Sequence, residues 1–183
     1  DFKQMSTEIP ITTSELAQIA STAGQLGIAK KDVESFTLVM AKLATTTDLT
    51  ADDAATMLAQ FSNVTGVKEY DRLGSAVARL GDSTATTASK VVQMSQGMAA
   101  SASIAGMKPT DILAIAAAVG SLGIEAQAGS TAMITLINNM YKATETGEKL
   151  EDFSKVAGMS AEQFKKSWSE DAAGTLNDFI QGS

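Results

Sequence analysis

The feature that most limits how this chain can fold is a central stretch with almost no charge. Between Val91 and Tyr141 only Lys108, Asp111 and Glu125 are charged, and Ala, Ser, Gly, Met, Ile and Leu supply most of the remaining positions. The two flanks carry all the other charged residues. A stretch of this kind is expected to leave water, so it forms the buried centre of a helical domain or packs against a partner or a lipid surface.

Apolar residues recur with helical spacing along the chain, and strand-like alternation is nowhere sustained. Prolines occur only at positions 10 and 109, and glycines separate the successive helical segments. We therefore predict an all-α fold: a bundle of about seven short-to-medium helices built from helical hairpins, plus a small helical C-terminal appendage. The predicted helices span residues 13–23, 30–46, 50–66, 68–80, 87–105, 109–122 and 125–145.

Local capping signals place several of these helix ends. Thr12 with Glu15 three residues later has the spacing of a capping box, and so do Thr50 with Asp53 and Ser160 with Gln163. Pro109 stands where a first-turn proline fits a helix without losing a hydrogen bond. Residues 1–10 are a polar lead-in to which we assign no structure. The helix 109–122 is apolar on nearly every side, which predicts burial all round.

Charge returns after residue 147, and this change divides the chain. We predict a helical core-region bundle over residues 1–147 and a short helical tail over residues 148–183. One short helix of the tail ends at Gly158, and two more follow. The tail packs on the bundle or leads into a next segment, and its apolar cluster comprises Phe164, Trp168, Leu176, Phe179 and Ile180.

Composition excludes several classes of function. The formal charge of −7 and the scatter of only 14 Lys and Arg residues argue against nucleic-acid binding, which needs clustered positive charge. The chain has no Cys and no His, which removes disulfides, thiol nucleophiles, Cys/His zinc sites and His-dependent catalytic triads.

The remaining sequence patterns that could indicate catalysis or metal binding are incomplete or absent. Asp52–Asp53 and Glu170–Asp171 are adjacent in sequence, and adjacent helical residues do not face each other, so we interpret them as solvated acids near helix N-termini. A calcium loop starting at Asp48 would need Gly at its sixth position, where Asp53 stands. We find no phosphate-binding or nucleophile motif. The prediction is that the chain is not an enzyme, with no catalytic, cofactor-binding or metal-binding residue and no small-molecule substrate.

Membrane insertion is the main physical alternative for the central stretch. Its unbroken uncharged runs, 112–124 and 126–141, fall short of the roughly 20 residues that a transmembrane helix needs. Ala114 with Ala118, and Ala116 with Gly120, have a spacing that lets helices approach closely in a membrane or in a soluble bundle. These lengths favour a buried soluble core.

A weak internal repeat links the two halves of the chain. Residues 27–33 resemble residues 106–112, a shift of 79 that places Phe36 on Ile115 and Leu43 on Leu122. A shift of 75 relates residues 49–58 to residues 124–133, and Gly158 begins a shorter third copy. The pattern predicts two related helical units packed together, unless chance similarity in an Ala-, Gly- and Thr-rich sequence explains it.

Many short segments, taken in order, resemble the core region of phage tail tape measure proteins. The similar segments cover most of the chain from Thr12 to Ile180, and the strongest runs from Ser121 to Ala132. The others are residues 16–28, 36–43, 49–55, 71–75, 80–87, 158–164 and 178–180.

This resemblance implies a fragment of a long helix-rich phage or prophage protein that lies in the lumen of the virion tail. Such a protein is assembled in the bacterial host cytoplasm, sets tail length, scaffolds assembly of the tail tube and leaves the tube at DNA ejection. The implied partners are the tail tube protein, tail assembly chaperones, baseplate or initiator proteins and further copies of the chain. The alternative function is a membrane-active helical segment that contacts and inserts into the host envelope during genome delivery.

Overall fold

The computed structural model describes residues 2–183, which form eleven α-helices and contain no β-strand. The all-α prediction is therefore confirmed. The helices are α1 (Phe2–Glu8), α2 (Thr13–Gln25), α3 (Val33–Thr46), α4 (Ala51–Thr65), α5 (Tyr70–Ser83), α6 (Ala88–Ile104), α7 (Pro109–Ser121), α8 (Ala126–Thr146), α9 (Leu150–Val156), α10 (Ala161–Glu170) and α11 (Ala172–Gly182).

The seven predicted main helices correspond to α2–α8, and the three short helices of the tail correspond to α9–α11. The capping boxes at Thr12 and Ser160 are both present. Helix α1 was not predicted, because its seven residues carry no capping signal. It contacts α2, and Met5 in α1 and Ile9 just after it are buried, so tertiary contact stabilises a segment whose local sequence does not specify a helix.

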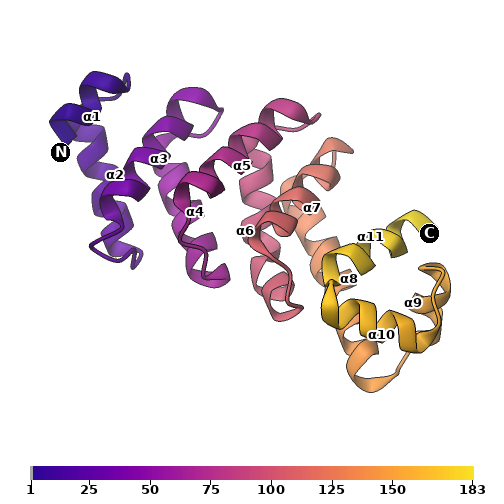
Figure 1. Ribbon diagram of the computed structural model, residues 1–183. Coiled ribbons are helices and arrows are strands. Elements are labelled where there is room, and N and C mark those ends of the chain that lie inside the picture. Colours follow the sequence, from indigo (N-terminus) through magenta and orange to yellow (C-terminus); the bar gives the residue numbers. More distant parts are fainter. Residues whose placement is uncertain (1) are drawn as a thin grey trace.

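Helices α2–α8 run alternately up and down and lie in sequence order along a row, and α9–α11 cluster beside α8 at its end (Figure 1). Helices α2, α4, α6 and α8 contact one another in succession and form one layer. Helices α3, α5 and α7 contact one another in succession and form a second layer against the first. The bundle is thus a stack of hairpins, in which each hairpin packs on its neighbours, as in helical repeat proteins.

The uncharged stretch between Val91 and Tyr141 forms the C-terminal half of this stack. Most of it lies in α6, α7 and α8, and α6 contacts α4, α5, α7 and α8. The side chains of Val91, Met94 and Met98 on α6 are fully buried. Burial of apolar side chains is the main driving force for such packing, so α6 is the helix that fits the buried-core interpretation.

Helix α7 departs from its prediction, because one of its sides faces solvent. Ala114 and Ala118 are exposed, Ile115 and Val119 are half-buried, and Leu122 in the following loop is 76% exposed. The prediction of burial all round is therefore wrong for α7. Helix α9, which would be the next member of the layer formed by α3, α5 and α7, has only seven residues and packs on α8, α10 and α11. The small side chains of Ala114 and Ala118 keep the apolar area of this side low.

The helices that form the first layer begin at nearly constant intervals. Their N-cap residues are Thr12, Thr50, Thr87 and Glu125, which follow one another every 37 or 38 residues. A loop of four residues leads into each of these helices. The repeat at a shift of 75 therefore corresponds to two consecutive units of 37 or 38 residues, a period within the range of helical repeat proteins.

Burial follows the same repeat. Six pairs of residues that correspond at a shift of 75 or 76 are buried in both copies, whereas the shift of 79 holds only around the loop that contains Gly27 and Gly106. The reason is that α6 is four residues longer than α2 and the loop after it is three residues shorter. The buried pairs are Leu16 and Val91, Ile19 and Met94, Phe36 and Ile112, Met40 and Ala116, Leu58 and Met133, and Ser62 and Ile137.

One helix-ending motif also recurs at the three places that the sequence repeat marks. Gly27, Gly106 and Gly158 have φ angles of 87°, 80° and 70°, a left-handed conformation that glycine adopts without strain. The residue after each glycine donates a backbone hydrogen bond to the carbonyl five positions earlier, as in a Schellman motif. These bonds run from Ile28 to Ala23 at 2.9 Å, from Met107 to Ala102 at 3.0 Å and from Met159 to Ser154 at 2.8 Å.

The tail forms a small aromatic cluster next to α8. Phe153 lies between Phe164, with ring centroids 6.4 Å apart, and Phe179, with ring centroids 5.4 Å apart. Phe164 also stacks on Trp168 at 6.4 Å. Helices α9 and α10 both contact α8. Aromatic rings bury large areas, so these few side chains hold three short helices together.

Candidate functional site

The described residues hold no group of three or more His, Cys, Asp or Glu side chains that could bind a metal ion. Asp52 and Asp53 lie exposed in the first turn of α4, where the Thr50 hydroxyl donates to Asp53 at 2.7 Å. Glu170 ends α10 and lies 4.0 Å from Lys166, whereas Asp171 caps α11 by accepting from the Gly174 N–H at 3.0 Å. Asp52, Asp53 and Asp171 thus lie at helix N-termini, where negative charge is favourable, whereas Glu170 lies at the C-terminus of α10 and makes a surface ion pair.

Two of the polar contacts that join different units lie along one edge of the stack. We call this the loop edge: the segments 47–50, 84–87 and 122–125, which precede α4, α6 and α8. The side chain of Asp48 accepts a hydrogen bond from the backbone N–H of Ser89 at 3.0 Å. The first turn of α6 contains no acidic residue of its own. Asp48 therefore supplies, from another loop, the negative charge that favours a helix N-terminus.

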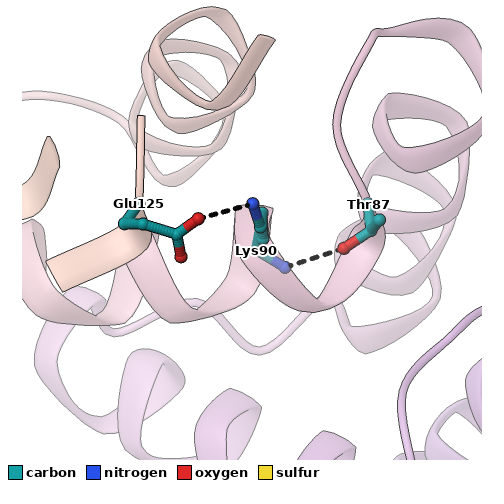
Figure 2. Close-up of polar contacts among 3 residues, drawn as sticks. All are labelled: Thr87, Lys90 and Glu125. Carbon is teal, nitrogen blue, oxygen red and sulfur yellow. Dashed lines mark hydrogen bonds and ion pairs between the residues drawn. The ribbon is translucent and has the colours of Figure 1, made fainter. Parts of the chain in front are cut away.

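A second contact holds the other side of the same helix end. The hydroxyl of Thr87 accepts from the backbone N–H of Lys90 at 3.2 Å, which caps α6. The ammonium group of Lys90 lies 3.2 Å from Glu125, the residue just before α8 (Figure 2). Glu125 is 78% exposed at its side chain, so this ion pair sets the position of the loop and adds little to stability. The N-terminus of α6 is thus tied to the loops of both neighbouring units.

Small residues allow α6 and α8 to approach closely below this edge. A Cβ atom on Gly97 of α6 would lie 2.9 Å from the Cβ of Ser130 on α8. A Cβ atom on Gly129 of α8 would lie 2.6 Å from Met94 of α6. Glycine at these positions removes the side chain that would hold the two helices apart. Gly97, which weakens α6 on helix propensity alone, therefore serves the packing between units.

The polar groups of the loop edge make contacts between helices and loops. Carboxylates, hydroxyls and one ammonium group there make hydrogen bonds to helix ends and to one another. Their geometry can fix one helical unit against the next. A structural role is the one that this arrangement supports.

Comparison with protein families agrees with a structural role. The family model of the phage-related minor tail proteins matches residues 1–182. The chain belongs to the phage-related minor tail protein family. No curated protein and no solved structure matches the chain at a significant level. As a member of this family, the chain is a structural component of a phage tail.

Insertion into a membrane was the alternative expectation for the central stretch, residues 91–141, of this minor tail protein. Among the helices of residues 2–183, none combines the length and the apolar character needed to cross a membrane.

The sequence did not reveal Asp48 as a residue that joins units. Asp48 stood out only as the first residue of a rejected calcium loop. The signal that could have found it is indirect: α6 lacks an acidic residue in its first turn, so a carboxylate from elsewhere is favourable there. Which loop supplies it depends on the stacking of the hairpins, because Asp48 and Ser89 are 41 positions apart.

Proposed function

We propose that this minor tail protein is a segment of a tail tape measure protein. In this role it lies in the lumen of the tail, sets tail length, scaffolds the assembly of the tail tube and leaves the tube at DNA ejection. It acts by packing and by length, without catalysis. Its partners are the tail tube protein, the tail assembly chaperones, the baseplate or initiator proteins and further copies of itself.

The observation that carries this proposal is the repeated unit of 37 or 38 residues, marked by the N-caps Thr12, Thr50, Thr87 and Glu125. A protein that sets the length of a tail must itself have a length that increases in proportion to its number of residues. A row of hairpins has this property, because each unit adds one step to the row (Figure 1). A drawn-out helical chain has it too, because each residue advances the helix by about 1.5 Å. The segment from Ser121 to Ala132, the strongest resemblance to tape measure proteins, supports the same role.

The repeat defines a clean experiment on the phage or prophage that encodes this chain. Deleting residues 50–124 removes two whole units and joins Leu49 directly to the N-cap Glu125. If the segment lies in the tail as extended helix, the tail should become shorter by about 110 Å, at about 1.5 Å for each deleted residue. Electron microscopy of negatively stained tails measures this length.

Duplicating residues 50–124 is the matched counterpart, and it should lengthen the tail by a similar amount. The duplication keeps every native contact between units. It therefore controls for the possibility that the deletion changes the tail only because it prevents assembly. Tails of unchanged length in both variants would contradict the proposal and would leave the chain as a minor tail protein with another structural role.

A further inference from the structure

Among residues 2–183, the first and the last helices of the stack pack on neighbours from one side only. Helix α1 packs on α2, and α11 packs on α9 and α10, whereas α6 packs on four helices. Every substantial contact joins helices that are close in sequence, and no segment of residues 2–183 folds back from one end of the row to the other. Opening an end unit therefore breaks one interface, whereas opening a central unit breaks two.

Helix α6 depends on these neighbours more than its sequence suggests. It contains four serines and Gly97, residues of modest or low helix propensity. Its buried residues nevertheless include Val91, Met94 and Met98. It is also tied to other units by Asp48, by a hydrogen bond between Gln96 and Gln60, and by the ion pair of Lys90 with Glu125. Its stability thus comes from tertiary contacts on both of its sides.

We propose that the stack formed by residues 2–183 opens from α1–α2 and from α9–α11 inward, and that α6 opens last, after both flanks have been released. Each end opens independently of the other, because no contact joins them. Within residues 2–183, the outer helices can therefore unfold in stages while α6 stays folded. This inference rests on the contacts of the fold and stands whether or not the protein sets tail length.

Native-state hydrogen exchange on the 183-residue chain, followed by mass spectrometry at low denaturant concentrations, tests this order. Amides of α1 and of α9–α11 should exchange through small openings that need little denaturant. Amides of α6 should exchange only through the largest opening. Equal protection in all helices, or protection that is lowest in α6, would overturn the proposal.

Two variants, one in α2 and one in α11, test whether the two ends of the stack open independently of each other. Ile19 in α2 and Leu176 in α11 are both buried, and truncating either to Ala should speed exchange by about thirtyfold or more in the segment that it stabilises. Ile19→Ala should speed exchange in α1–α3 and in α6 but not in α9–α11. Leu176→Ala should speed exchange in α9–α11 and in α6 but not in α1–α3.

Every other outcome counts against the proposal. If either variant speeds exchange equally at both ends, the chain opens as one cooperative unit. If neither variant changes exchange in α6, then α6 opens without its flanks and is not the last to open. Should an Ala variant fail to fold, Ile19→Val and Leu176→Val provide the same comparison with a smaller truncation, expected to change exchange by about two- to tenfold.

Discussion

The carboxylate of Asp48 accepts a hydrogen bond from the backbone N–H of Ser89, which lies 41 positions further along the chain, at 3.0 Å. This bond connects the loop before α4 to the first turn of α6. It satisfies a backbone donor that a helix leaves free at its N-terminus, and it places a negative charge beside that terminus. One exposed side chain thereby links the N-terminal half of the stack to its most buried helix.

Replacing Asp48 by Ala should therefore lower the free energy of unfolding by about 1 kcal/mol, the usual effect of losing a helix cap. Asp48→Asn keeps an acceptor oxygen and should lose less. Asp178→Ala is a control for the loss of an exposed carboxylate that makes no side-chain hydrogen bond among the described residues; because Asp178 lies in α11, where Ala is the better helix former, this substitution should keep or slightly raise stability. Urea unfolding followed by circular dichroism measures all three. Equal stability of Asp48→Ala and Asp178→Ala would show that the bond does not contribute.

Gly97 and Gly24 make a pair of helical glycines with opposite expected effects. A Cβ on Gly97 would come within 2.9 Å of Ser130, whereas nothing lies within 4 Å of a Cβ on Gly24. Gly97→Ala should destabilise the chain by about 1 kcal/mol, because overpacking outweighs the gain in helix propensity. Gly24→Ala should stabilise it by about 0.5–1 kcal/mol. Thermal unfolding distinguishes these outcomes, and a stabilising Gly97→Ala would contradict the close approach of α6 and α8.

The parts of this fold that local sequence specifies were predictable, and the parts that depend on stacking were not. Thr12 with Glu15 and Ser160 with Gln163 were found because a capping box lies within four residues. Asp48 with Ser89 was missed because its partners meet only once hairpins stack. The exposed side of α7 was missed because hydrophobicity alone does not reveal that the short α9 packs elsewhere.

The 37- or 38-residue unit was only half visible in the sequence for a similar reason. Few residue types recur between single units. Comparison of the amino-acid sequence with itself therefore detected the repeat only over two units together, as at a shift of 75. What recurs in every unit is a position: an N-cap residue after a four-residue loop, followed four residues later by a buried small or apolar residue. Leu16, Ala54, Val91 and Gly129 occupy that buried position.

Acid should remove one contribution to stability at the start of α2. The hydrogen bonds that Glu15 accepts from the Thr12 side chain and backbone hold the pKa of its carboxyl below the ordinary value of 4.5. Because the folded pKa is lower than the unfolded one, this contribution is fully present above pH 4.5 and is lost as the pH falls through the folded pKa. Stability gained from the Glu15 charge should therefore be seen at pH 7 and not at pH 2.

Comparison with Glu15→Gln tests this directly, because Gln keeps an acceptor at the same position without a charge. The melting temperature of the original chain should exceed that of Glu15→Gln at pH 7, and the difference should vanish at pH 2. Carbon-detected NMR of the Glu15 carboxyl should give a midpoint below 4.5. A difference in melting temperature that is the same at both pH values would exclude the charge as its cause.

Ala116 and Ala114 lie on the same helix, two residues apart, and test how the central stretch is packed. Ala116 is fully buried, and Ala114 is exposed. Ala116→Asp should destabilise the chain by at least about 3 kcal/mol, because an unpaired carboxylate in a packed core is among the costliest substitutions. Ala114→Asp should cost less than about 1 kcal/mol, including a weak repulsion from Asp111 one turn earlier. Urea unfolding of the two variants measures this difference. Similar effects of the two substitutions would contradict the assignment of one buried and one exposed side to α7.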